Sequence, residues 1–97
     1  MTGPSGAPLP VLMRPGEIIS LKEAVYRTGK SEKTISRWCR ADGIGRRTSP
    51  TSSWEISAVA LEAKLYGDGQ AIEELRRGNF EAQRVRRYAE HLGLASL

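Results

Sequence analysis

Apolar residues recur at helical spacing in several short segments of the chain, and polar residues that begin or end helices bound these segments. A first helix is predicted from residue 21 to about residue 27, with apolar positions three and four residues apart. Ser20 precedes it and Glu23 follows three residues later, a capping-box pattern in which each side chain satisfies a free backbone N–H. Gly29 can adopt the left-handed backbone conformation that ends such a helix.

A second short helix is predicted from residue 32 to about residue 41, with Ser31 as its N-cap and Gly43 as its stop. Its cationic residues fall on the face opposite its apolar residues. We expect three residues of this segment to face the core: Ile35, Trp38 and Cys39. Two short helices joined by a glycine-containing turn of three or four residues describe a helix-turn-helix.

The pattern then changes to short extended segments. Residues 44–48 and 53–56 are predicted strands, and the polar stretch "SPTSS" between them is turn material. Together they predict a β-hairpin with a polar tip and with basic residues, Arg46 and Arg47, just before that tip. Ser57 is the predicted N-cap of a third helix over residues 58–66.

The last segment, "QAIEELRRGNFEAQRVRRYAEHLGL", predicts either two helices or one helix with a weak middle at Gly78 and Asn79. Its second half carries an apolar stripe that either binds another protein or packs back on the domain: Val85, Tyr88 and Leu92. Three arginines of the same segment either touch DNA or form a solvated face: Arg84, Arg86 and Arg87.

Four of the five prolines lie within residues 1–16, and this composition predicts a disordered leader. The expected organisation has three parts. Residues 1–16 form the leader, residues 17–68 the folded domain, and residues 69–97 a C-terminal helical segment with a possible protein–protein contact.

The 97 residues suffice for one small domain and contain no apolar run of 18 residues, so no membrane span is expected. The first residues lack the apolar stretch of a signal peptide, and the single cysteine excludes an internal disulfide. We therefore expect a cytoplasmic protein. No nucleotide-binding glycine loop, zinc-ligand set or nucleophile–base pair is present, so we expect neither an enzyme nor a metal or cofactor.

The positive charge is concentrated in one part of the chain. Residues 27–47 contain seven positive and two negative side chains, a net charge of +5. The whole chain carries +4, so the remainder is about neutral. A local excess of this kind is typical either of a solvated helix face or of a surface that binds a polyanion; its place on the predicted helix-turn-helix favours the polyanion.

The segments "SLKEAVYRTG", "KTISRW", "GRR" and "WEIS" carry a resemblance to a known family. Residues 20–57 resemble the winged helix-turn-helix shared by phage excisionases and the DNA-binding half of MerR-like regulators. The resemblance implies a mainly α-helical fold with a small β-hairpin wing. It further implies that residues 32–41 lie in the major groove of DNA and that the hairpin reaches the minor groove or the backbone.

The resemblance and the chemistry of the side chains together give a predicted set of DNA contacts. Arg37 lies one turn beyond Lys33 and can reach a guanine edge with its forked guanidinium. Arg40 is placed to meet phosphate, and Arg46 or Arg47 to enter a narrow minor groove. The full predicted set is Ser31, Lys33, Thr34, Ser36, Arg37, Arg40, Arg46 and Arg47.

About 30 residues follow the third predicted helix, fewer than a MerR-like effector part needs, which favours the excisionase type. Such proteins bind adjacent sites cooperatively, bend DNA and help an integrase to excise a mobile element. An integrase is therefore an expected partner, with self-association along DNA through the C-terminal helix. The alternatives are a transcriptional regulator of the same fold, the DNA-recognition subunit of a phage terminase, or an adaptor that binds protein through that helix.

Overall fold

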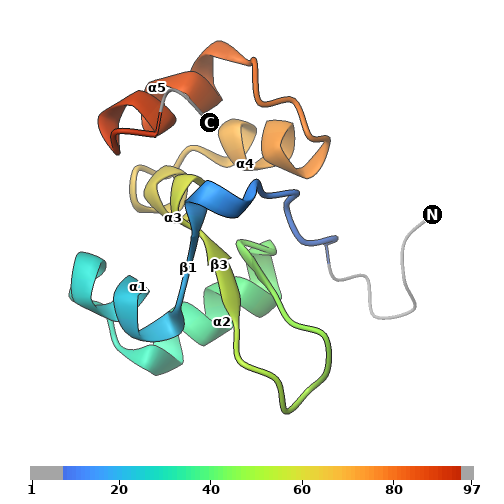
Figure 1. The fold of residues 1–97 in the computed structure, drawn as a ribbon, viewed down its shortest axis with the longest axis vertical. Helices are drawn as coiled ribbons and strands as arrows, with labels where there is room; N and C mark the ends of the chain where they lie inside the picture. The colour runs from blue at the N-terminus through green and yellow to red at the C-terminus, as the bar shows by residue number, and fades with distance from the viewer. Residues whose placement is uncertain (1–7, 95–97) are drawn as a thin grey trace.

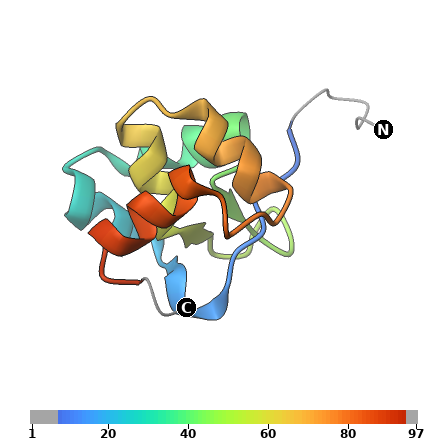
Figure 2. The same ribbon diagram turned by 90° about the horizontal axis from the view of Figure 1, so that it is seen from above.

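The computed structural model describes residues 8–94, which form five α-helices, one 3-10 turn and a small three-stranded antiparallel sheet. The helices α1 and α2 and the loop between β2 and β3 lie at one end of the molecule (Figure 1). The helices α4 and α5 lie at the other end, and α3 lies between the two groups. Viewed from above, α5 lies across α3 and beside α4 (Figure 2).

The helix α1, Leu21–Thr28, begins where the sequence predicts. Ser20 Oγ accepts a hydrogen bond from the N–H of Glu23 at 3.0 Å. The Glu23 carboxylate binds Arg27 at 2.9 Å, so only the serine half of the expected capping box forms. Gly29 ends the helix with a φ of 72°, the left-handed conformation that was predicted for it.

The helix α2, Glu32–Asp42, follows after a turn of three residues and packs against α1. Thr28 stabilises the turn, because its hydroxyl donates to the carbonyl of Ala24 and accepts from the N–H of Lys30. Ser31 caps α2 through the N–H of Thr34 at 3.1 Å. Gly43 ends it with a φ of 70°.

The sheet has the strand order β1–β3–β2. The hairpin strands β2, Gly45–Arg46, and β3, Glu55–Ser57, are shorter than the predicted segments and pair Arg46 with Glu55. The third strand, β1, Ile18–Ile19, was not predicted and pairs with β3 on its other side. It follows the 3-10 turn Pro15–Glu17, whose Glu17 carboxylate is buried and accepts from Ser57 Oγ.

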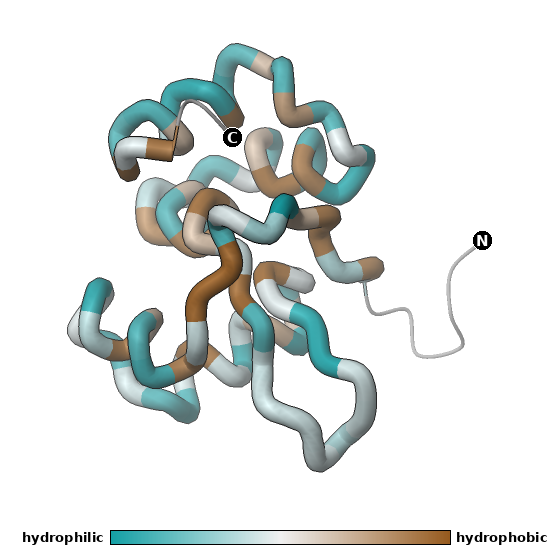
Figure 3. Tube along the Cα trace, viewed as in Figure 1, coloured by the Kyte–Doolittle hydropathy of each residue, from teal (hydrophilic) through white to brown (hydrophobic). Residues whose placement is uncertain are grey.

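The helix α3, Ala58–Leu65, is the centre of the core, with five of its eight residues buried. The end segment forms two helices rather than one, α4, Gly69–Arg76, and α5, Gln83–His91. Both pack on α3, and a single hydrophobic cluster includes residues on both sides of the expected boundary at 68/69. The apolar positions gather along β1, β3 and the centre of the molecule (Figure 3).

The apolar stripe of α5 faces this core. Val85 and Tyr88 are buried, and Leu92 packs against the cluster. Of the two interpretations of the stripe, the structure therefore supports packing back on the domain. Val85 and Tyr88 are therefore not available as a contact surface, and self-association through other residues of the C-terminal helix stays a prediction.

The prediction of a disordered leader was wrong for its second half. Residues 1–7 lie outside the described part of the chain. The side chain of Val11 is only 2% exposed, and its N–H donates to the carbonyl of Gly43 at 2.8 Å. The N–H of Leu12 donates to the carbonyl of Leu75 at 3.1 Å. A few apolar and backbone contacts are thus enough to order a segment whose composition indicates disorder.

Candidate nucleic-acid interface

The helix α2 places its cations outward, as its sequence pattern predicts. Ile35 and Cys39 are buried on the inner face. Three cationic side chains are exposed on the outer face: Lys33, Arg37 and Arg40. They lie three and four residues apart, so they form one stripe along the exposed side of the helix.

The predicted hydroxyl contacts lie at the start and middle of the same helix. Ser31 Oγ accepts from the N–H of Thr34 and donates to Thr34 Oγ1 at 3.1 Å. These two hydroxyls therefore have partners within the chain and shape the first turn of α2. Thr34 and Ser36 are half-buried, which leaves the stripe of cations as the most accessible part of the surface.

The β2–β3 loop, residues 47–54, extends beyond the sheet at the end of the molecule that carries α1 and α2 (Figure 1). It is polar along its length (Figure 3). Its hydroxyl groups bind one another, with Thr48 Oγ1 and Ser49 Oγ each 2.8 Å from Ser52 Oγ. These bonds give the tip a defined shape.

The two adjacent arginines of the hairpin have different surroundings. Arg46 Nε donates to Glu55 Oε1 at 2.9 Å, across the β2–β3 pair. The guanidinium of Arg47 instead lies over the indole ring of Trp54, 4.2 Å from the ring centre. Trp54 in turn packs against the core. The charge of Arg46 is therefore largely balanced, whereas that of Arg47 is not.

The strand β2, which leads into Arg47, packs against the last turn of α2: a Cβ atom on Gly45 would lie 2.7 Å from Cys39 Sγ. Burial raises the pKa of Cys39 to about 12, against the opposing effect of two nearby positive charges, Arg40 and Arg47. The start of the hairpin thus lies beside the end of α2, and the buried thiol is a core group, as its sequence context predicts.

The cations at the two ends of the molecule differ in how many have a carboxylate partner. Within residues 8–94, seven of the 15 lysines and arginines have no carboxylate within 4.0 Å. Six of them lie in α1, α2, the turn between them and the β2–β3 loop: Lys22, Lys30, Lys33, Arg37, Arg40 and Arg47. On α5, Arg84 pairs with Asp68 at 3.1 Å and Arg86 with Glu90 at 3.9 Å.

The predicted DNA contacts did not include Lys22 or Lys30, nor the indole ring of Trp54 that lies beneath Arg47. Lys22 and Tyr26 are four residues apart on the outer side of α1, and Tyr26 is 85% exposed. The helical spacing alone places these two side chains on one face. Glu32 lies among the cations without a basic partner among the described residues, and as an acid in the first turn it suits the helix dipole.

Within residues 8–94, no group of three or more His, Cys, Asp and Glu side chains could hold a metal ion. No helix in this part of the chain is long and apolar enough to cross a membrane. Comparisons of the chain with protein-family models, with curated proteins and with solved structures gave no match. The function must therefore be inferred from the residues themselves.

Proposed function

We propose that this protein binds double-stranded DNA in a sequence-specific manner through a winged helix-turn-helix. In this proposal α1 and α2 form the helix-turn-helix, and the β2–β3 hairpin is the wing. The observation that carries the proposal is that six cations without ion-pair partners lie in α1, α2, the turn between them and the wing, at one end of the molecule (Figure 1). Unbalanced cations on one surface favour a polyanion, because binding releases the counterions of its phosphates.

The shape of α2 supports its placement in the major groove. Its 11 residues extend about 16 Å at a rise of about 1.5 Å per residue, and the groove is about 12 Å wide. In this placement Arg37, in the middle of the outer face, reaches base edges with its guanidinium. Arg40 lies closer to the phosphate backbone of the DNA. The wing then brings Arg47 to the neighbouring phosphates or minor groove.

The buried stripe of α5 favours DNA binding over an adaptor function. An adaptor that binds protein through α5 needs an exposed apolar face. Val85, Tyr88 and Ala89 instead complete the core. The remaining surface of α5 is charged, and most of its arginines have acidic partners.

Within DNA-binding proteins, we propose the excisionase type, in which several copies bind adjacent sites, bend the DNA and assist an integrase. A single module of this size makes a small interface, so adjacent sites would strengthen binding. Contacts between copies would use a surface other than the apolar stripe of α5. Footprinting on DNA from the native element separates this function from a regulator: several phased sites indicate excision, and one promoter site indicates regulation.

Two matched triple variants test the proposal. The first replaces Lys33, Arg37 and Arg40 with Gln, and the second replaces Arg84, Arg86 and Arg87 with Gln. Each removes three charges, from α2 or from α5. We expect the first to lower the slope of log K against log salt by about two units, from the phosphate contacts of Lys33 and Arg40 at about 0.9 each, and to lose the base contact of Arg37 as well. We expect the second to bind duplex DNA within about twofold of the wild type, because its three residues lie outside the proposed surface and two of them, Arg84 and Arg86, already have acidic partners.

Equal losses in the two triple variants would show that DNA binding, if present, is a matter of net charge and not of this surface. An absence of salt-dependent binding to duplex DNA by the wild type would contradict the proposal directly.

A further inference from the structure

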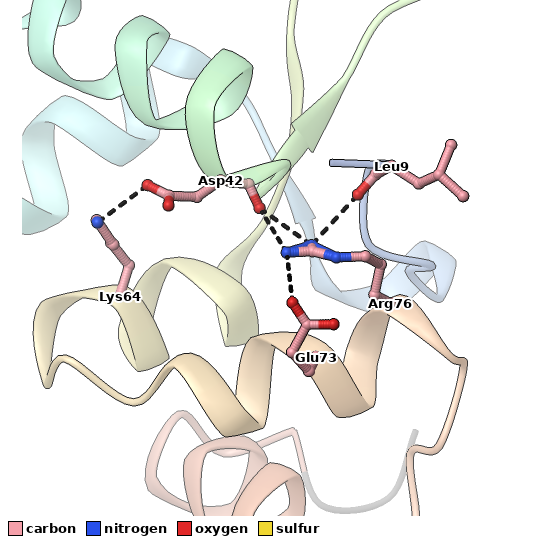
Figure 4. Close-up of polar contacts among 5 residues, drawn as sticks. All are labelled: Leu9, Asp42, Lys64, Glu73 and Arg76. Carbon is pink, nitrogen blue, oxygen red and sulfur yellow. Dashed lines mark hydrogen bonds and ion pairs between the residues drawn. The ribbon is translucent and has the colours of Figure 1, made fainter. Parts of the chain in front are cut away.

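The C-terminal end of α2 is bound by a guanidinium group from α4. Arg76 Nη1 and Nη2 each donate to the carbonyl oxygen of Asp42 at 3.2 Å. Nη1 also donates to the carbonyl of Leu9 at 3.2 Å, and Nη2 lies 3.3 Å from Glu73 Oε2 (Figure 4). The last carbonyls of a helix have no partner within it, and a cation beside them is favourable. Arg76 therefore satisfies and fixes the end of α2.

A second cation holds the same residue by its side chain. Lys64 Nζ, from α3, lies 2.9 Å from Asp42 Oδ2 (Figure 4). Asp42 is thus bound through its main chain by α4 and through its side chain by α3. The side chain of Arg76 is only 15% exposed, so its bonds are shielded from competition by water better than those of a surface pair.

Residues 9–12, the N-terminal strap, run between the ends of α2 and α4. The strap bonds to Gly43 through Val11 and to Leu75 through Leu12. A Cβ atom on Gly43 would lie 2.6 Å from the carbonyl oxygen of Leu9, so the strap touches the backbone at the end of α2. Arg76 binds both the strap and α2, and so joins the three segments at one point.

We propose that Arg76 is a positioning residue for DNA recognition, because it and the N-terminal strap set the orientation of α2 on the body of the domain. This inference rests on the proposed function. Base contacts such as that expected of Arg37 require a defined geometry, whereas attraction to phosphate is far less directional. Loss of Arg76 should therefore weaken binding to the preferred sequence more than binding to other sequences.

The test begins with selection of preferred duplexes from a randomised pool by the full-length wild-type chain. Affinity for an enriched duplex and for its scrambled counterpart is then measured for Arg76→Gln. We expect about a tenfold loss on the enriched duplex, the size of one good base contact, and less than about a twofold loss on the scrambled one. Arg76→Lys keeps the charge but not the planar fork, so it should fold like the wild type and lose part of the discrimination.

Two control variants separate positioning from general destabilisation. Arg77→Gln removes the same charge from the next residue, whose partner is Glu74 at 3.6 Å on the surface. Val85→Ala weakens the core at α5 without touching the end of α2. Both should keep the ratio of the two affinities, even if Val85→Ala lowers the free energy of unfolding more than Arg76→Gln does.

Cys39 gives a measurement that does not depend on DNA. It is the single cysteine of the chain, it lies in the last turn of α2, and it is 3% exposed. Its reaction with a thiol reagent requires local opening of that turn. We expect Arg76→Gln to react several-fold faster than Val85→Ala under native conditions.

The outcomes distinguish the inference from the proposed function. If the wild type enriches no sequence, the proposed function fails and the role of Arg76 in recognition fails with it. If the wild type discriminates and both Arg76 variants discriminate equally well, the proposed function stands and the positioning role is overturned. The positioning role would also be overturned if Cys39 in Arg76→Gln reacted no faster than the loss in the free energy of global unfolding accounts for.

Discussion

Arg47 lies over the indole ring of Trp54, with its guanidinium carbon 4.2 Å from the ring centre, while its neighbour Arg46 binds Glu55. Arg46 is the last residue of β2 and lies opposite Glu55 of β3, whereas Arg47 and Trp54 are the first and last residues of the loop, so the hairpin separates two adjacent and otherwise similar cations. The ring holds the guanidinium without neutralising it, and such contacts contribute about 0.5–1 kcal/mol at exposed sites. Arg47 therefore keeps a charge with which it can attract phosphate.

The two arginines should differ in their effect on DNA binding. We expect Arg47→Gln to lower the slope of log K against log salt by about one unit, the effect of one lost phosphate contact. We expect a smaller change from Arg46→Gln, because Glu55 already balances that charge. Anisotropy titrations over a range of salt concentrations measure both slopes. A larger effect at Arg46 would mean that its ion pair opens on DNA and that Arg46 is the principal contact of the wing.

Arg37→Ala should remove sequence preference rather than binding itself. Loss of a bidentate contact to a base costs about 1–3 kcal/mol, and the loss falls only on duplexes that carry that base. Arg86→Ala on α5 is the control, since it removes an equal charge from a side chain with an acidic neighbour. Binding to single-base variants of an enriched duplex measures the preference. If Arg37→Ala weakens all duplexes equally, Arg37 contacts phosphate and another residue reads the bases.

Two glycines that end helices should respond differently to substitution by alanine. Gly29 and Gly43 have φ values of 72° and 70°, so alanine strains each by about 1–2 kcal/mol. A Cβ on Gly29 meets nothing within 4 Å, whereas on Gly43 it meets the N-terminal strap at 2.6 Å. We therefore expect Gly43→Ala to lower the free energy of unfolding more than Gly29→Ala in urea titrations. Equal losses would show that the strap contributes little to the stability of this end of α2.

Acid should weaken the attachment of α5 through Asp68. Burial acts to raise the pKa of Asp68, but the N–H of Ala71, the hydroxyl of Tyr88 and the charge and hydrogen bond of Arg84 together lower it below 3.8. The unfolded state then binds the proton more readily. The contribution of Asp68 is therefore complete above its unfolded pKa and is lost as the pH falls through its folded pKa.

Asp68→Asn tests this dependence on pH. At pH 7 it should cost about 1–2 kcal/mol, a typical value for weakening a helix cap and a charged hydrogen bond. The difference from the wild type should be smaller at pH 3 than at pH 7, because the contribution of the Asp68 charge is lost progressively as the pH falls below its unfolded pKa. Thermal unfolding at both pH values measures it, with the exposed Glu81→Gln as the control. A loss that is the same at both pH values would mean that the charge of Asp68 is not involved.

The starts of the helices could be predicted because their signals are local. Ser20, Ser31 and Ser57 each accept from an N–H three residues along the chain. The outward direction of the cations on α2 also follows from its periodicity alone. These parts of the fold and of the candidate surface need no information from distant segments.

The features that were missed depend on residues far away in the sequence. The two residues of β1 form a strand because β3 lies beside them, with Ile18 opposite Ser57. The N-terminal strap is ordered by carbonyl groups at Gly43 and Leu75. Such contacts leave no periodic signal, and the proline-rich composition of the first residues indicated the opposite. Likewise, the neutralisation of Arg46 depends on the register of the hairpin.

The most direct test of the central claim, that α2 and the wing present the surface for DNA, is a titration of the labelled protein with duplex DNA followed by NMR. We predict that the amide signals perturbed first belong to residues 31–40 and 46–54, and that those of α5 change little. Perturbations centred on α5, or none at DNA concentrations that saturate binding by anisotropy, would contradict this account.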